Sequence, residues 1–308
     1  KAVQATGESR LIHRLIDSLD SRLARPSIRL ALGSLGNASF DALCSTFTDS
    51  STREGVRTHI PRSLMHFHSQ RSVDFLTQLL TVEKRGRTRF KTLRALNHLS
   101  AVGLVSPKLK LSFDKRLFER EALKNLTEYC RMRNVYRALG RHSDAGPTET
   151  PVRAALLALL SDKMDQALER TFRCLGLAHR GEDLHGVHLA IVRGDRRVKA
   201  NAAEFLDALP YLVVELREAL RVIVDDQLDD ERERQALLNL GIAPIAGHDE
   251  ACRFLLQDPD ELLAALAAHH VLEAGLVQLA IEARSAILAR PQLGRLGADR
   301  ESTYPEAS

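Results

Sequence analysis

The sequence predicts an all-α protein, built as a right-handed α-solenoid of about six to eight helical hairpins. Hydrophobic residues make up 44% of the chain and are mostly Leu and Ala, which favour helices. They recur at helical spacing, and the period-two runs that strands need are scarce. Similar positions also repeat, because Phe40 and Phe75 are 35 residues apart and Val56 and Phe90 are 34 apart. One helical hairpin per repeat of this length is typical of α-solenoids.

Residues that favour helix boundaries separate the expected helices of the first half. Pro26 starts a helix, Gly36 and Asn37 end it, and Ser39 is expected to cap the next one. Pro61 predicts a kink or a shifted start in its helix. The expected helices are Glu8–Ala24, Ser27–Leu35, Phe40–Phe47, Arg53–Phe67, Ser72–Val82, Thr88–Leu99 and, after an irregular joint at Gly103–Ser112, Phe113–Leu139.

The stretch Arg193–Leu209 shows the hairpin pattern most clearly. Gly194 and Asp195 predict a tight turn, and an amphipathic helix follows it. Its expected apolar face holds Val198, Ala202, Phe205, Leu206 and Leu209. Such a helix cannot bury this face alone, which favours stacking on a neighbour. The other helices expected in the second half are Pro151–His179, Glu182–Val192, Pro210–Val224, Gln235–Leu240, Asp249–Leu256, Glu261–Leu272 and Val277–Leu288.

Composition divides the chain into a basic and an acidic part. Residues 1–200 carry a formal balance of +15 and residues 201–308 one of −11. Such an asymmetry indicates a basic surface for nucleic acid, acidic protein or anionic lipid, although two solvated faces of opposite sign would give the same numbers. We expect basic helical repeats over residues 1–140, a linker at 141–150, repeats with an acidic end over 151–290, and a tail at 291–308.

The cellular compartment is inferred from what the sequence lacks. The four cysteines form no CxxC pair, which indicates reduced thiols in a cytoplasmic compartment. No apolar stretch approaches the ~20 residues of a membrane span, and the first residues do not resemble a signal peptide. Because the chain opens on Lys1 rather than Met, a longer parent protein remains an open alternative.

Motifs for catalysis, cofactors and metals are absent from the sequence. It contains no GxxxxGK loop, no GxSxG elbow and no HExxH pair. His185 and His188 share a helix face, with Asp183 or Cys174 as a third candidate ligand, but ordinary surface or interface histidines explain this spacing better. We therefore expect no catalytic residues, no cofactor and no metal. An enzyme would need a deep pocket where perturbed acids and histidines converge.

A set of basic residues on the second helices of successive hairpins is the strongest candidate for function. In stacked hairpins, equivalent residues line up along one surface, so these cations are expected to form a ladder that holds phosphates or an acidic partner. Solubilising charge at repeat turns is the alternative. The candidate partner-binding residues are Arg53, Arg57, Arg62, Arg87, Arg89, Lys91 and Arg94.

Several stretches resemble HEAT repeats. GDRRVKANAAEFL has an acidic turn, Val-Lys where the family prefers Val-Arg, a small residue and a Leu-terminated helix. Together with His59–Leu64, Arg89–Asn97 and Leu168–Leu177, it is similar to HEAT-repeat regions of bacterial proteins fused to ATP/ADP-translocase-like transporter domains. The likeness spans roughly residues 39–225 and carries no catalytic residues.

The expected function is that of a non-catalytic scaffold or regulatory module that recognises a protein partner through its solenoid surface. The resemblance adds an expected attachment to a membrane transporter by a domain outside this chain. Nucleic-acid binding on the basic half is the alternative, and a steep dependence of affinity on salt would favour it.

Overall fold

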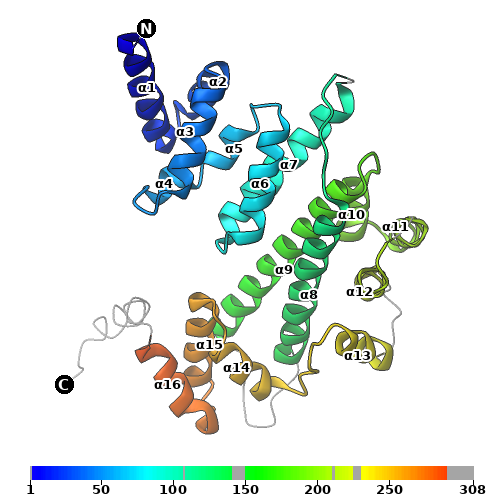
Figure 1. Ribbon diagram of the computed structural model, residues 1–308. Helices are drawn as coiled ribbons and strands as arrows, with labels where there is room; N and C mark the ends of the chain where they lie inside the picture. Colours follow the sequence, from blue (N-terminus) through cyan, green and yellow to red (C-terminus); the bar gives the residue numbers. More distant parts are fainter. Residues whose placement is uncertain (1, 107, 141–149, 210–211, 225–229, 290–308) are drawn as a thin grey trace, which may run out of the picture. The chain divides into compact units, whose positions relative to one another are not determined.

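The fold is all-α in the residues that the computed structural model describes, which are 2–106, 108–140, 150–209, 212–224 and 230–289 (Figure 1). Every regular element in these ranges is a helix, and none of these residues lies in a strand. The predicted fold class is therefore confirmed at the level of an all-helical protein.

The chain divides into two compact units, each made of two stretches of the sequence, and the predicted repeat regions stay a prediction. Unit 1 consists of Lys1–Ala122 and Arg170–Leu189, and unit 2 of Leu123–Glu169 and Ala190–Ser308. The division takes this form because α8 (Lys115–Gly140) and α9 (Pro151–Ala178) each contribute residues to both units. Residues 141–149 of the predicted linker and the predicted tail at 291–308 lie outside the described residues.

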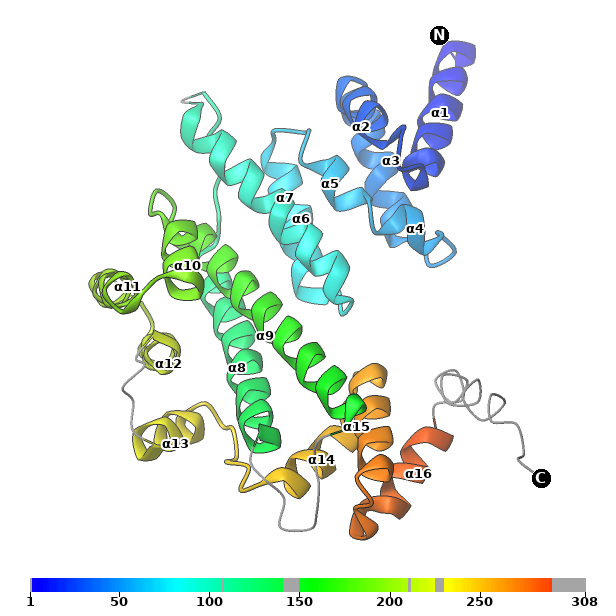
Figure 2. The same cartoon turned by 180° about the vertical axis from the view of Figure 1, so that it is seen from behind.

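Unit 1 begins with a series of short helices. Within it α5 contacts α2, α3 and α7, and α6 pairs with α7 (Figures 1 and 2). The core of the α6–α7 pair includes Leu76, Leu80, Leu93 and Leu96, each fully buried, and burial of each stabilises the fold by about 2 kcal/mol. The elements are α1 (Ala2–Asp17), η1 (Ser18–Asp20), α2 (Arg25–Ser34), α3 (Asn37–Thr48), α4 (Glu54–Arg57), α5 (Ile60–Leu64), α6 (Gln70–Val82) and α7 (Gly86–Val105).

Two boundary predictions in this unit need correction. Ser39 does not cap α3 but lies inside it, and its hydroxyl donates to the carbonyl of Leu32 at 2.6 Å. The cap position is Gly36, whose φ of 69° is one that glycine adopts without strain. The predicted helix Arg53–Phe67 is two helices, α4 and α5, because Pro61 fits only the first turn of a helix.

In unit 2 several helices pack on the next one along the chain. Contacts join α11 to α12, α12 to α13, α14 to α15, and α15 to α16. One core cluster joins the last part of α8 and the first part of α9 to α14, α15 and α16. The elements that follow α9 are α10 (Leu184–Arg193), which begins in unit 1, α11 (Arg196–Ala208), α12 (Val214–Val224), α13 (Asp230–Asn239), α14 (His248–Leu256), α15 (Glu261–Glu273), η2 (Val277–Leu279) and α16 (Ala280–Leu288).

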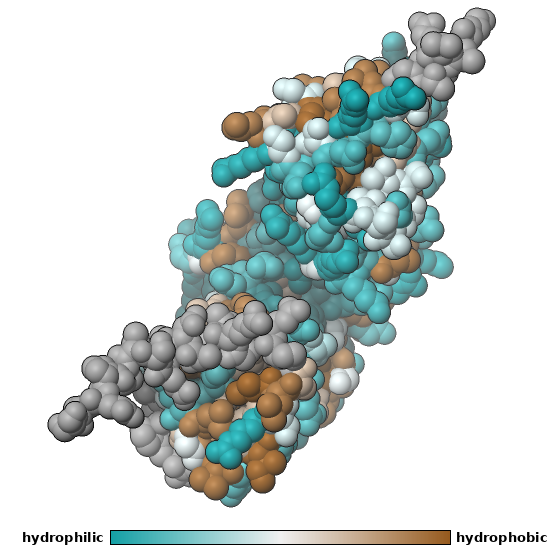
Figure 3. Space-filling view, turned by 90° about the vertical axis from the view of Figure 1, so that its left-hand side faces the viewer, coloured by the Kyte–Doolittle hydropathy of each residue, from teal (hydrophilic) through white to brown (hydrophobic). Residues whose placement is uncertain are grey.

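The described helices give no membrane span. None of them combines the length and the apolar character needed to cross a bilayer. Hydrophilic side chains cover most of the face shown in Figure 3, and apolar side chains form separate patches on it.

Candidate functional site

The structure separates the seven residues of the predicted basic ladder into two groups. Three of them contact other parts of unit 1. The Arg53 guanidinium lies 3.7 Å from the Asp20 carboxylate. The Arg57 guanidinium lies over the ring of Phe47, 5.1 Å from its centroid. Arg89 is a structural residue, since it donates to the buried carboxylate of Glu121 at 3.0 Å. These contacts stabilise the fold. Of the other four cations, Arg94 also lies over a ring, that of Phe90, 5.9 Å from its centroid, but none of the four forms an ion pair within the described part of the chain.

The other four, Arg62, Arg87, Lys91 and Arg94, lie together with two arginines that the sequence analysis did not single out. We call the six the cationic cluster. Arg25 and Arg29 lie on α2, Arg62 lies on α5, and the remaining three lie on α7. The effect of these charges on Lys91 indicates that the residues lie close together. After burial, the charges of Arg87, Arg25, Arg29 and Arg62 lower the pKa of Lys91. The members of the cationic cluster are Arg25, Arg29, Arg62, Arg87, Lys91 and Arg94.

Local folding explains why these side chains meet. Arg87, Lys91 and Arg94 follow each other at helical spacing, so they share one face of α7. Arg25 and Arg29 are likewise one turn apart on α2. Because α5 packs against both α2 and α7, these faces converge on it. The i, i+4 spacing of Arg25 and Arg29 could have added both residues to the predicted basic set. The expected helix began at Ser27, however, which separated Arg25 from Arg29.

A neutral histidine lies at the centre of the cationic cluster. His59 occupies the break between α4 and α5, and its Nδ1 lies 3.2 Å from Lys91 Nζ and 3.4 Å from Arg29 Nη2. Burial, then the charges of Lys91, Arg25 and other cations, lowers the pKa of His59 to about 4, so the ring is neutral at pH 7. Lysine and arginine can only donate, so Nδ1 is the acceptor and the ring proton lies on Nε2.

The charges of the cationic cluster are not neutralised within the described part of the chain. None of the six cations forms an ion pair with an acidic side chain there, and the buried Nε of Arg29 has no hydrogen-bond partner. Burial and the neighbouring Arg62 and Arg25 lower the pKa of Arg29 to about 10. Burial and neighbouring arginines also lower the pKa of Lys91 to about 8. The arrangement therefore favours the arrival of an anion.

The sequence-predicted histidine pair does not form a comparable site. His185 and His188 lie on α10 with ring centroids 6.4 Å apart, and His188 packs against Phe172. In the described residues, neither of these histidines belongs to a group of three or more side chains that could hold a metal ion.

A pocket of about 440 Å³ between α11 and α12 is a further candidate site. Its size suits a small molecule, and its lining includes the apolar side chains of Leu206 and Leu220. The charges that line it are partly paired, because Arg221 lies 3.2 Å from the Asp207 carboxylate. The cationic cluster is therefore the stronger candidate site.

Comparison with known proteins identifies no relative of this chain. No protein-family profile matches it, and neither a characterised protein nor a solved structure was found to match.

Proposed function

We propose that this chain is a non-catalytic binding module that recognises an acidic protein partner through the cationic cluster. The observation that carries the proposal is the gathering of six cations, four of which lie close enough to lower the pKa of the neutral His59, without an acidic partner among the described residues. Like charges held together and partly removed from water destabilise a folded protein. A partner carboxylate that reaches Lys91 and Arg62 relieves this repulsion and gains charge-assisted hydrogen bonds.

The burial of the cationic cluster favours a protein partner over a nucleic acid. Arg29 is only 7% exposed, and Arg62 and Lys91 are half-buried. A carboxylate on a flexible Glu or Asp side chain can reach half-buried cations, whereas phosphates along a duplex need cations that project from the surface, as only Arg87 and Arg94 of the cluster do. Apolar side chains are also exposed next to the cluster's arginines in the sequence, with Leu23 at 93% and Leu30 at 65%. Apolar and cationic side chains together are typical of protein interfaces.

Nucleic-acid binding is the second candidate function. It is favoured by the net formal charge of +15 over residues 1–200, because the six cations of the cluster account for only part of this excess. Contacts between cations and the phosphates of a nucleic acid give an affinity that falls steeply as the salt concentration rises. The dependence of affinity on salt therefore distinguishes the two candidate functions.

The proposal includes a HEAT-like, right-handed solenoid as the scaffold. Consecutive helices that pack in pairs, such as α6 with α7 and α11 with α12, support this architecture. The resemblance to HEAT-repeat regions of transporter fusion proteins supports a partner or parent protein at a membrane transporter. In that setting the module acts as a regulatory or scaffolding part on the cytoplasmic side.

The proposal is tested by the binding of a fluorescent peptide that alternates Glu with Leu. We expect the double variant Arg62→Gln/Lys91→Gln to bind this peptide at least about 10-fold more weakly than the wild-type chain, because two charged contacts are lost. The matched control is Arg116→Gln/Arg120→Gln, which removes the same charge from exposed positions of α8 within unit 1. It should bind like the wild type.

Two outcomes contradict the proposal. Equal losses in both double variants would mean that only net charge matters. Tighter binding of a DNA duplex of similar length, with affinity that falls steeply between low and moderate salt, would assign the cationic cluster to nucleic acid instead.

A further inference from the structure

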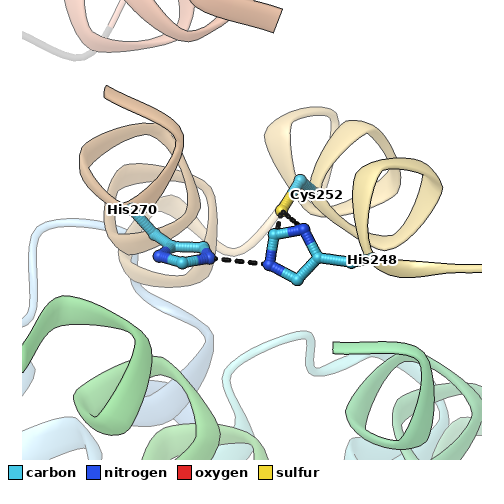
Figure 4. Close-up of side chains that lie close together, drawn as sticks. All are labelled: His248, Cys252 and His270. Carbon is cyan, nitrogen blue, oxygen red and sulfur yellow. Dashed lines mark hydrogen bonds between the residues drawn. The ribbon is translucent and has the colours of Figure 1, made fainter. Parts of the chain in front are cut away.

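Two histidines and a cysteine converge in the core of unit 2, far along the chain from the cationic cluster. His248 and Cys252 lie one turn apart on α14, and His270 faces them from α15 (Figure 4). All three are buried, with exposed fractions of 3%, 0% and 0%. Their donor atoms lie within 4.8 Å of one another. Among the described residues, they form the one group of three or more His, Cys, Asp or Glu side chains that could hold a metal ion. We call them the His–Cys–His group.

The geometry brings the two imidazoles together at their Nε2 atoms. His248 Nε2 and His270 Nε2 are 2.9 Å apart, and Cys252 Sγ lies 4.0 Å from His248 Nε2. The sulfur lies equally close to the other ring nitrogen, 3.9 Å from His248 Nδ1, so it lies beside the His248 ring and not in line with the Nε2 atom. Burial raises the pKa of Cys252 to about 12, so without a bound ion this thiol carries its proton at neutral pH.

The outer nitrogen of each imidazole has an oxygen partner. His248 Nδ1 lies 3.1 Å from Asp249 Oδ1, and His270 Nδ1 lies 3.0 Å from Thr150 Oγ1. Histidines that bind metals almost always have such an oxygen at the second nitrogen, which orients the ring and leaves the first nitrogen free to coordinate. When both Nδ1 atoms carry the proton, the two Nε2 lone pairs face each other and repel, unless a cation lies between them.

We propose that the His–Cys–His group binds a divalent transition-metal ion of the zinc type. Two imidazoles and one thiolate are a donor set that zinc prefers. Tetrahedral zinc with bonds of about 2.0 Å to nitrogen and 2.3 Å to sulfur places two nitrogens ~3.3 Å apart and nitrogen and sulfur ~3.6 Å apart. The two Nε2 atoms, 2.9 Å apart, reach their value with a shift of a few tenths of an ångström. Cys252 Sγ lies 4.0 Å from His248 Nε2 and within 4.8 Å of the His270 donor, so the thiol must rotate toward the ion to coordinate it.

The charges balance when the ion binds. Cys252 loses its thiol proton to solvent and coordinates as a thiolate, and both imidazoles coordinate as neutral rings. The thiolate and the neighbouring Asp249 carboxylate together offset the charge of a divalent cation. The buried Arg153 adds a positive charge that acts on both Cys252 and His270. Three protein donors leave the fourth position to a small ligand such as water.

The alternative arrangement contains no metal. In it the Thr150 hydroxyl donates to His270 Nδ1, His270 Nε2–H donates to His248 Nε2, and His248 Nδ1–H donates to Asp249. The two arrangements differ in one respect that is measurable, because only the metal site uses the Cys252 sulfur as a ligand.

The test is a titration of the chelator-treated full chain with Co²⁺, followed by competition with Zn²⁺. We expect one equivalent of Co²⁺ to bind with a thiolate-to-cobalt charge-transfer absorption. This absorption should be unchanged in Cys44→Ala, which removes a thiol that is only partly buried and lies outside the group. It should disappear in Cys252→Ala, which should also bind Zn²⁺ at least about 100-fold more weakly than the wild type.

A second variant guards against misfolding of Cys252→Ala. Asp249 is 46% exposed at its side chain, so Asp249→Asn should fold like the wild type, which circular dichroism can verify. The amide keeps an acceptor oxygen for His248 Nδ1–H but removes the carboxylate charge that makes the imidazole a stronger ligand, so it should weaken Zn²⁺ binding by about 10-fold. No charge-transfer absorption in the wild type, the same absorption in Cys252→Ala, or unchanged affinity in Asp249→Asn would each overturn the proposal.

Discussion

At the scale of single residues, Lys91 and His59 set the chemistry of the cationic cluster. Burial and four neighbouring arginines lower the pKa of Lys91 from 10.5 to about 8, so its ammonium group is still mostly charged at pH 7. The pKa of His59 falls to about 4, so its ring accepts hydrogen bonds from the cations and adds no charge of its own. A partner carboxylate that binds at pH 7 therefore meets a charged Lys91, and Lys91 loses this charge when the pH rises above about 8.

Acidic-peptide binding should weaken as the pH rises through about 8. The peptide stays ionised in this range, while Lys91 loses the proton that makes it a cation. Between pH 7 and pH 9.5 we expect a loss of about 10-fold in affinity, measured by fluorescence anisotropy. In Lys91→Arg the charge persists, so the profile should be flat. A wild-type profile that is equally flat would exclude Lys91 as a contact.

The stability of the free chain should change in the opposite direction over this range. Because the pKa of Lys91 is lower in the folded state than in the unfolded state, the unfolded chain binds more protons between pH 8 and 10.5. The contribution of Lys91 to the free energy of unfolding therefore rises with pH in that window and is smallest below it. This opposite trend separates a loss of binding from a loss of folding.

Arg89 and Lys91 show how far single residues could be predicted. Both lie on α7, two positions apart, and both were expected to bind a partner. Arg89 instead pairs with Glu121, which lies 32 residues further along the chain on α8. The helix and its basic character follow from local spacing. Which cation finds a carboxylate depends on long-range packing, which spacing within one helix does not reveal.

At the scale of elements, the connection before α11 was predicted from the sequence as a turn, and the structure adds its helix cap. Gly194 and Asp195 were expected to form the turn, and the Asp195 carboxylate accepts a hydrogen bond from the backbone N–H of Val198 at 2.9 Å. The apolar face is confirmed at Ala202, Leu206 and Leu209, which are buried, whereas Val198 is 40% exposed. A first-turn side chain of a helix often has no neighbour to cover it, which periodicity alone does not show.

Replacing the α11 cap should loosen this helix. Asp195→Ala removes the acceptor for the Val198 N–H, and we expect a loss of about 1 kcal/mol in local stability. Amide hydrogen exchange in the first turn of α11 should accelerate about 5-fold. Asp195→Asn keeps an acceptor oxygen and should exchange like the wild type. If it exchanges as fast as Asp195→Ala, the carboxylate charge rather than the cap hydrogen bond stabilises the turn.

The break between α4 and α5 is the element that matters most for the candidate site. The sequence indicated that Pro61 would disturb a helix at Arg53–Phe67. The structure places Thr58 and His59 in a gap between two short helices, and this gap brings His59 to Lys91 and Arg29. Proline chemistry predicts a disturbance, but the exact restart of the helix depends on packing against α2 and α7.

At the scale of the whole molecule, composition predicts the helical fold and local spacing predicts most helices. The division into units was less accessible, because α8 and α9 look like ordinary long helices in sequence and yet each contributes to both units. The charge asymmetry between residues 1–200 and 201–308 pointed to the basic part. It could not show that some of these cations are paired and others gather around His59.

The central claim is that an acidic partner binds at the cationic cluster, and an amide hydrogen-exchange footprint of the full chain tests it most directly. The footprint compares the free chain with the chain saturated by the acidic peptide. We predict added protection in α2, in residues 54–64 and in the first turns of α7, with α11 and α12 unchanged. Protection confined to α11 and α12, or no protection at α2 and α7 at saturation, would contradict the account.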